Sequence, residues 1–392
     1  MSHSTGSRRK ICVVVNSRAN YGRIKTVLRS ITEHPRLELQ LVIGASALLW
    51  RFGNVSEVIA RDGFSPVATV YSIVEGETPT TMAKSTGLAI MELATTFENI
   101  RPDVVLTVAD RFETIATAIA GAYMNIPVAH TQGGEVTGSI DESVRHAVTK
   151  LAHIHFPATA LAAENLVRMG EERATVHLTG CPSIDVLAAL DLSLRADFFS
   201  GGKGVGATID PSRRYVVVLQ HPVTTEYGNG LKQIRETLSA VLRIGLQAIW
   251  LWPNVDAGSD DISKGLRQFR EQHPSAPIHF YRNFSVEDYA RLIYHASCLV
   301  GNSSSALREG SFLGVPAVNI GTRQAGRERD ENVRDVGYEA RDIERAVHFQ
   351  IDHGRYRRST RFGDGHAGKR IADLLATSTF QVQKRLSFGD HV

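Results

Sequence analysis

The sequence predicts an α/β fold made of two doubly wound halves that face a cleft. Three observations predict it. Short apolar runs alternate with longer helical segments, a glycine-rich break separates two such series, and polar residues follow nearly every apolar run. The alternation is typical of parallel sheets that helices cover on both faces. A chain of 392 residues is also long enough for two domains rather than one.

The first series runs from residue 11 to residue 152. Its short apolar or β-branched runs predict strands at 11–15, 37–44, 67–71, 104–108 and 126–129. Helical spacing of apolar residues predicts helices at 21–31, 80–97, 112–124 and 143–152. All of these strands except the one at 37–44 are followed by a predicted helix, so the strands should be parallel.

The second series follows residues 194–212, whose four glycines and Pro211 predict a linker or domain-edge loop. Strands are expected at 215–220, 247–251, 278–281, 298–301 and 317–320. Helices are expected at 231–243, 260–272, 286–295 and 306–313, with two more near 343–353 and 369–385.

The composition excludes several classes of protein. The net charge of +3 is accounted for by Arg8, Arg9 and Lys10 in the N-terminal tail, which argues against a nucleic-acid footprint over the whole surface. Three scattered cysteines are too few for a disulfide or zinc framework. There is no apolar run of membrane-spanning length and no signal-peptide pattern at the N-terminus, so we expect a cytoplasmic protein.

An acid-rich stretch, residues 130–153, lies between a predicted strand and a predicted helix. It holds three carboxylates (Glu135, Asp141 and Glu142), a double glycine and three histidines. Open parallel sheets bind ligands at the carboxyl ends of their strands, where this stretch begins. A solvated loop could also hold several acids, and Glu142 fits a charge in the first turn of the helix.

Other strand ends carry polar residues of the same kind. Arg18 lies in the first strand-to-helix turn, Asp110 and Arg111 follow the strand at 104–108, and His221 and Asn254 follow two strands of the second half. A guanidinium can bind phosphate, and a histidine can donate to phosphate or move a proton near neutral pH. Helix caps, surface charges or a structural histidine would explain each residue taken alone.

The strand at 298–301 is followed by three serines that indicate an anion site. Ser303, Ser304 and Ser305 present hydroxyl donors at a strand-to-helix turn, although a single serine would suffice as a helix cap. Glu309 lies one helical turn further on, where its carboxylate could accept hydrogen bonds from the two hydroxyls of a ribose. Arg323 adds a guanidinium after the last strand. Neither the GxGxxG dinucleotide fingerprint nor the Walker phosphate loop is present.

Several segments together carry a family resemblance. In chain order they are NSRANYG, ADRFET, GGEVTGSIDESVRHAVTKLAH, GCPSID, LQHPVTTE, WPNVDAGS and GNSSSALREGSFLGVPAVNIGTRQAGRERDENV. They resemble the hydrolysing UDP-N-acetylglucosamine 2-epimerases, most of all the epimerase half of the bifunctional sialic-acid enzyme and its bacterial single-function relatives. The resemblance covers residues 10–335.

The resemblance implies a fold of the glycosyltransferase-B type with two Rossmann-like domains. Residues 1–190 would form the domain that carries the acid–base carboxylates, and residues 213–370 the UDP-binding domain. A C-terminal helix within 371–392 would cross back to the first domain. Relatives of this kind form homodimers or homotetramers and need no metal or nicotinamide cofactor.

The resemblance also implies the conversion of UDP-N-acetylglucosamine and water into N-acetylmannosamine and UDP, by way of a 2-acetamidoglucal. By motif position, the catalytic residues would be Asp110, Glu135, Asp141 and His221, and which carboxylate takes the C2 proton stays open. The residues that would contact the UDP-sugar are Arg18, Arg111, Asn254, Ser303, Ser304, Glu309 and Arg323.

Three alternatives remain open at this stage. The substrate could be a UDP-2,4-diacetamido sugar of a legionaminic-type pathway, or the chain could be a glycosyltransferase or a catalytically silent nucleotide-sugar sensor. The sequence also departs from the resembled pattern at three positions, because Asn20, Gly22 and Gln132 replace residues of other types. None of the three removes a proposed acid–base group.

Overall fold

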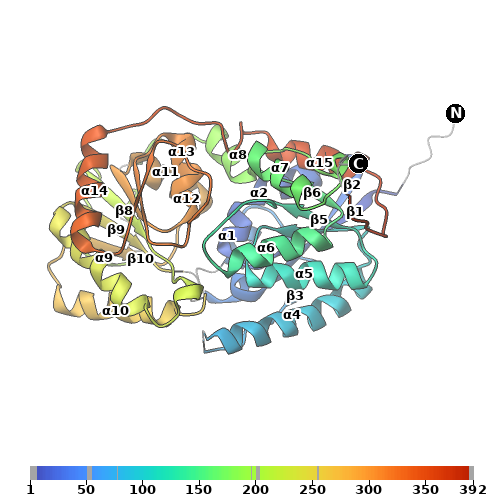
Figure 1. Cartoon of the computed structure of the whole chain (residues 1–392), viewed down its shortest axis with the longest axis horizontal. Helices are drawn as coiled ribbons and strands as arrows, with labels where there is room; N and C mark the ends of the chain where they lie inside the picture. The colour runs from blue at the N-terminus through green and yellow to red at the C-terminus, as the bar shows by residue number, and fades with distance from the viewer. Residues whose placement is uncertain are drawn as a thin grey trace.

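The computed structural model describes residues 7–50, 55–76, 78–195, 197–199, 204–253 and 256–387, and it consists of two α/β domains joined side by side (Figure 1). Each domain has a mostly parallel sheet with helices on both faces. The predicted fold, two doubly wound domains of the glycosyltransferase-B type, is confirmed.

The first domain contains a six-stranded parallel sheet in the order β3-β2-β1-β4-β5-β6. The strands are β1 (Arg9–Val15), β2 (Leu37–Gly44), β3 (Ala68–Val70), β4 (Val104–Val108), β5 (Val128–Thr131) and β6 (Ile154–Phe156). The helices are α1 (Arg18–Gly22), α2 (Lys25–Glu33), α3 (Val55–Arg61), α4 (Pro79–Ile100), α5 (Phe112–Tyr123), α6 (Ile140–Leu151), α7 (Ala160–Arg168) and α8 (Pro182–Ala189).

The second domain repeats this strand order around its own first long strand, giving β13-β12-β11-β8-β9-β10-β7. The strands are β7 (Val205–Gly206), β8 (Tyr215–Leu219), β9 (Gln247–Leu251), β10 (Ile278–Tyr281), β11 (Cys298–Gly301), β12 (Ala317–Ile320) and β13 (Val333–Val336). The helices of this domain are α9 (Gly230–Ile244), α10 (Ser259–Gln272), α11 (Val286–His295), α12 (Ser304–Leu307), α13 (Glu309–Leu313) and α14 (Ala340–His353), and α15 (Ala367–Thr377) follows them in the chain.

The continuous apolar runs of the strands follow from burial on both faces. In β1, Ile11, Val13 and Val15 pack toward α2 and α3, whereas Cys12 and Val14 pack toward α4 and α5. Side chains of a strand alternate between the two faces of a sheet, so covering both faces requires apolar residues at every position. The same rule explains β8, which is buried throughout.

The sequence missed elements whose pattern is short or polar. β13 has no buried residue, and β6 has only three residues, so neither forms the apolar run that predicts a strand. The helix expected at 21–31 is two helices, because Ser17 caps a short α1 that ends at Gly22. The helix expected at 306–313 is likewise broken at Arg308 into α12 and α13.

The predicted linker at 194–212 is partly a strand of the second sheet. β7 pairs antiparallel with β10 within this segment. Gly204 and Gly206 have φ angles of 100° and 128°, and a Cβ on either would come within 2.4 Å of a carbonyl of β10. The glycines that resembled a flexible linker therefore allow close packing against an edge strand.

The last helix, α15, lies on the first domain (Figure 1). Ile371, Ala372 and Leu375 belong to the same core as β1 and α2. The helix begins before the predicted 371–392 segment and ends at Thr377, where the guanidinium of Arg9 donates to the carbonyls of Leu375 (2.5 Å) and Ser378 (2.8 Å). Such side-chain donors satisfy carbonyls that a helix end leaves open.

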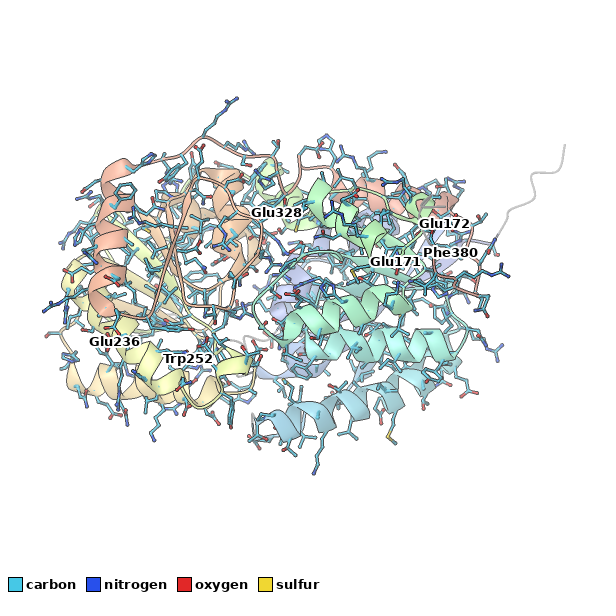
Figure 2. The ribbon with its side chains drawn as sticks, viewed as in Figure 1. Glu171, Glu172, Glu236, Trp252, Glu328 and Phe380 are labelled. Atoms are coloured by element: carbon cyan, nitrogen blue, oxygen red, sulfur yellow. The ribbon has the colours of Figure 1, made fainter. Side chains whose placement is uncertain are left out.

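The segment after α15 stays on the surface of the first domain. The guanidinium carbon of Arg9 lies 5.4 Å from the ring centre of Phe380, and Lys384 Nζ pairs with Glu171 at 2.5 Å (Figure 2). These contacts hold residues 378–387 against the domain without helical structure. No helix in the described part of the chain is long and apolar enough to cross a membrane.

Asp185 on α8 fixes the start of α15, and its removal gives a test of this connection. Its carboxylate accepts hydrogen bonds from the backbone N–H groups of Ala367 (2.9 Å) and Gly368 (2.6 Å) and from Thr26 Oγ1 (3.0 Å). We expect Asp185→Ala to lower the free energy of unfolding by about 2 kcal/mol, because bonds to a charged acceptor are lost and N–H groups are left unpaired. Chemical denaturation followed by circular dichroism measures this change.

Asp197 provides the matched control, because its side chain is 68% exposed. Asp197→Ala should change the unfolding free energy by less than about 0.5 kcal/mol. Equal stability of the Asp185 and Asp197 variants would contradict the role assigned to Asp185.

Candidate active site

A cleft between the two domains collects most of the predicted site residues. It encloses about 1030 Å³ of space, part of which is open to solvent. Nine of the eleven predicted residues line it, namely Arg18, Asp110, Arg111, Asp141, His221, Ser303, Ser304, Glu309 and Arg323. Asn254 lies outside the described residues, and Glu135 does not line the cleft.

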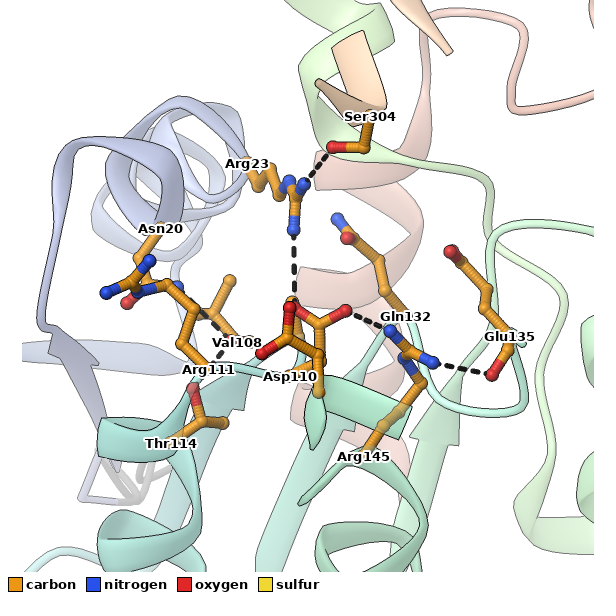
Figure 3. Close-up of polar contacts among 12 residues, drawn as sticks. Asn20, Arg23, Val108, Asp110, Arg111, Thr114, Gln132, Glu135, Arg145 and Ser304 are labelled. Carbon is orange, nitrogen blue, oxygen red and sulfur yellow. Dashed lines mark hydrogen bonds and ion pairs between the residues drawn. The ribbon is translucent and has the colours of Figure 1, made fainter. Parts of the chain in front are cut away.

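Asp110 lies between two guanidinium groups at the end of β4 (Figure 3). Arg145 of α6 forms an ion pair with its Oδ2, and Arg23 Nη1 lies 3.8 Å from its Oδ1. Burial by itself would raise the pKa of Asp110, but Arg145 and Arg23 hold that pKa well below its ordinary value. Asp110 is therefore ionised at neutral pH.

Asp141, in the first turn of α6, differs from Asp110 in its affinity for protons. Arg323 Nη2 of the second domain lies 3.5 Å from its Oδ2. Burial and the charge of Asp110 nevertheless raise the pKa of Asp141 above its ordinary value. Two carboxylates whose pKa values are pushed apart in one cleft are typical of acid–base sites. Glu142, which follows Asp141 in the acid-rich stretch, instead accepts a hydrogen bond from the backbone N–H of Thr137 (2.9 Å).

Glu135 is buried between arginines of the second domain and does not reach the cleft. Its Oε2 pairs with Arg308 and with Arg327, whose Nε lies 3.1 Å away, and its backbone carbonyl accepts a bond from Arg145 (2.7 Å, Figure 3). Burial opposes ionisation, but Arg308 and Arg327 lower the pKa of Glu135 to about 2. A role in proton transfer would require this carboxylate to leave both arginines.

His221 follows β8 and faces the cleft from the second domain. Asn302 holds its backbone, since His221 N–H donates to Asn302 Oδ1 (2.7 Å) and Asn302 Nδ2 donates to the carbonyl of His221 (2.9 Å). Burial, together with the charges of Arg323 and Arg18, lowers the pKa of the imidazole well below its ordinary value. The ring is therefore neutral at neutral pH and can donate a hydrogen bond without carrying a charge.

The serine turn after β11 lies beside this histidine. Ser303 Oγ accepts the backbone N–H of Ser305 (3.4 Å), and Ser304 Oγ accepts a hydrogen bond from Arg23 Nη2 (2.6 Å, Figure 3). The helix that follows, α12, has only four residues, so its dipole is much smaller than that of the longer helix we expected here. Hydroxyl and guanidinium groups supply most of the donors for an anion.

Two further arginines cross from the first domain to the second. Arg18 Nη1 donates to the carbonyl of Arg282 (3.1 Å) and to Asn283 Oδ1 (3.0 Å). Arg111 Nη1 pairs with Asp256 Oδ1 at 2.8 Å. These contacts join the two domains across the cleft.

The sequence missed two arginines that shape this site. Arg23 lies between α1 and α2, and Arg145 lies in the second turn of α6, so neither carries the strand-end signal that identified the others. The i,i+4 spacing of Asp141 and Arg145 was the available clue, because it places both on one helix face. Among the described residues, no group of three or more His, Cys, Asp or Glu side chains could hold a metal ion.

Comparisons with known proteins agree on one family. A family model described as UDP-N-acetylglucosamine 2-epimerase matches residues 29–376. The chain is 33% identical to a hydrolysing UDP-N,N'-diacetylbacillosamine 2-epimerase of Legionella pneumophila, over 96% of this chain and 97% of that protein. It is 30% identical to a UDP-N-acetylglucosamine 2-epimerase of Neisseria meningitidis, over 97% of this chain and 99% of that protein.

Solved structures share the fold at lower sequence identity. The structure of a UDP-GlcNAc 2-epimerase from Neisseria meningitidis bound to UDP-GlcNAc superposes with a TM-score of 0.77 at 18% identity, over 94% of this chain and 100% of that chain. The UDP-GlcNAc 2-epimerase of Methanocaldococcus jannaschii, in complex with UDP-GlcNAc and UDP, gives a TM-score of 0.78 at 16% identity, with the same coverage.

The pairing of Glu135 with Arg308 gives a pH-dependent prediction. We expect Arg308→Met to lower the free energy of unfolding by about 3 kcal/mol at pH 7, because a broken buried pair leaves a charge poorly compensated. The lowered pKa of Glu135 stabilises the folded protein above about pH 4.5, and this contribution is lost as the pH falls toward about 2. The stability gap between wild type and variant should therefore narrow on acidification.

Thermal unfolding of both proteins at several pH values measures the gap. Arg345→Met, at a side chain that is 79% exposed, is the control and should match the wild type throughout. A gap of equal size at every pH would contradict a charge interaction with Glu135.

Proposed function

The chain belongs to the UDP-N-acetylglucosamine 2-epimerase family, and we propose that it is a hydrolysing epimerase of a UDP-linked 2-acetamido sugar. With UDP-N-acetylglucosamine as substrate, the products are UDP and N-acetylmannosamine. One observation carries the proposal: an acid–base pair, Asp110 and Asp141, faces an anion-binding set, Ser303, Ser304 and Arg323, across one cleft.

In the proposed reaction, the second domain binds the nucleotide. The diphosphate lies against Ser303, Ser304 and Arg323, and Glu309 accepts hydrogen bonds from the ribose hydroxyls. Neutral His221 donates a hydrogen bond to the departing diphosphate. These donors act where negative charge develops as the C1–O bond breaks, which lowers the barrier for departure of UDP.

The first domain carries out the proposed proton transfers. A carboxylate takes the proton from C2, the electron pair forms the C1=C2 double bond, and UDP leaves with the bonding electrons of C1–O. Water then adds its hydroxyl to C1, and a proton returns to C2 on the opposite face. Asp141, whose pKa is raised, is the better of the two groups to exchange a proton, and ionised Asp110 is suited to act as its partner.

Glu135 keeps its proposed catalytic role only if the domains move. Arg308 and Arg327 belong to the second domain, so opening of the cleft would free the carboxylate and closing would bind it again. Such a motion would also admit substrate and release UDP.

The sugar of the substrate has two candidates. The sequence favours UDP-N-acetylglucosamine through its resemblance to sialic-acid enzymes. The 33% identity to a UDP-N,N'-diacetylbacillosamine 2-epimerase, against 30% for the UDP-N-acetylglucosamine enzyme, supports a 2,4-diacetamido sugar at least equally. Both candidates share the chemistry at C1 and C2 and differ in the substituents at C4 and C6.

Product identification with both donors tests the function. We expect the purified protein to release UDP and a free 2-epimerised sugar from at least one of them, with deuterium at C2 when the reaction runs in deuterium oxide. Proton NMR reports the product, its configuration and the exchange in one experiment. Release of neither UDP nor free sugar from either donor would refute the proposal.

A second prediction concerns the nucleotide. Arg323→Ala should weaken UDP binding about 10- to 100-fold, because a hydrogen-bonded charged contact contributes about 1.5–3 kcal/mol. Isothermal titration calorimetry measures the affinity. Arg267→Ala, on the exposed face of α10, is the matched control and should bind UDP as the wild type does. Equal affinities of both variants would place the diphosphate elsewhere.

A further inference from the structure

His130 at the end of β5 is fully buried, does not line the cleft, and has no part in the reaction proposed above. Its Nε2 lies 2.8 Å from the backbone carbonyl oxygen of Ala109. Because a carbonyl oxygen only accepts hydrogen bonds, Nε2 must carry the proton of the ring. The other nitrogen, Nδ1, has no hydrogen-bond partner among the described residues.

This histidine does not exchange protons in the pH range of a working enzyme. Burial lowers its pKa to about 3, even though the bond to Ala109 opposes the shift. The ring is therefore a neutral donor at neutral pH. The hydrogen bond of the ring is to the backbone carbonyl of Ala109, the residue before Asp110.

Ala109 has a backbone conformation that its side chain disfavours. Its φ is 62°, in the left-handed region, where a residue with a Cβ is uncommon. Both of its backbone polar groups are held from β5: its N–H donates to the carbonyl of Thr131 (3.2 Å), and its carbonyl accepts from His130. Without the second bond, the peptide between Ala109 and Asp110 would be free to rotate toward a more favourable conformation.

Rotation of that peptide would move Asp110. The preceding carbonyl, of Val108, is already fixed by Asn20 Nδ2 (3.3 Å) and Thr114 Oγ1 (3.2 Å), so the turn at Ala109 determines where the next side chain points. In the observed conformation, Asp110 meets Arg145 and Arg23 (Figure 3).

We infer that His130 is a positioning residue, which holds the left-handed turn at Ala109 and thereby keeps the carboxylate of Asp110 in its place on the cleft wall. The inference rests on the proposed function, since it concerns catalysis only if Asp110 acts on the substrate. It assigns His130 a role through the backbone and no contact with the substrate.

Two substitutions separate the donor from the bulk of the ring. His130→Phe removes the N–H donor and keeps a planar ring, so kcat should fall about 100-fold, the loss expected from a small misplacement of a catalytic group. UDP affinity should stay within about twofold of wild type, since the proposed diphosphate-binding residues Ser303, Ser304 and Arg323 belong to the other domain. His130→Gln retains an N–H donor and should recover most of kcat.

A double-mutant cycle with Asp110→Asn distinguishes a role of His130 in positioning Asp110 from a general disturbance of the fold. If His130 acts through Asp110, adding His130→Phe to Asp110→Asn should lower kcat by no more than about twofold. His155→Phe is the matched control, because His155 is the register partner of His130 on β6, is equally buried and binds Glu171 away from the cleft. This control should lose thermal stability and keep kcat.

Three results would overturn the inference: a wild-type kcat in His130→Phe, losses that multiply with those of Asp110→Asn, or no recovery in His130→Gln. A crystal structure of His130→Phe gives a readout that needs no substrate. It should show Ala109 out of the left-handed region and Asp110 displaced from Arg145, and an unchanged turn would refute the role of His130. Failure of the wild-type protein to turn over either donor would instead refute the proposed function.

Discussion

Pairing between buried guanidinium groups and carboxylates determines how the two domains meet. Glu135 of the first domain lies between Arg308 and Arg327 of the second, and Arg111 of the first pairs with Asp256 of the second. An ionised group removed from water without a partner costs several kcal/mol, so each of these contacts constrains the arrangement of the domains. The loops beside them approach closely as well, since a Cβ on Gly138 would come within 1.9 Å of the carbonyl oxygen of Thr322.

The ion-pair partners of the three carboxylates also give them different pKa values. Glu135 is enclosed by arginines of the other domain, Asp110 pairs mainly with Arg145 of its own domain, and Asp141 faces the cleft with the guanidinium of Arg323 at 3.5 Å. The arginines lower the pKa values of Glu135 and Asp110, whereas burial and the charge of Asp110 raise the pKa of Asp141. The raised pKa of Asp141 supports the acid–base role proposed for it, whereas Glu135 is held in ion pairs by arginines of the second domain.

Much of the cleft could be predicted because the carboxyl ends of parallel strands lie at one edge of a sheet. Asp110, His221 and Ser303 each follow a strand that the apolar pattern identifies, so local sequence placed them at the cleft without knowledge of the packing. Arg23 and Arg145 lie away from strand ends, and only the packing of helices against the sheets brings them to Asp110. The local sequence does not show whether a charged residue on a helix is exposed to solvent or buried in an ion pair.

The sequence by itself determined the two doubly wound domains, the family and the edge of each sheet that faces the cleft, because strand period, burial on both faces and strand-end chemistry are local properties. Tertiary structure decided which carboxylates reach the cleft, which arginines neutralise them and where the last helix packs. Proton affinity and domain contact depend on distances between residues that are far apart in the chain. The sequence assigns Glu135 and Asp141 the same acid–base role, and only their neighbours in space give them different pKa values.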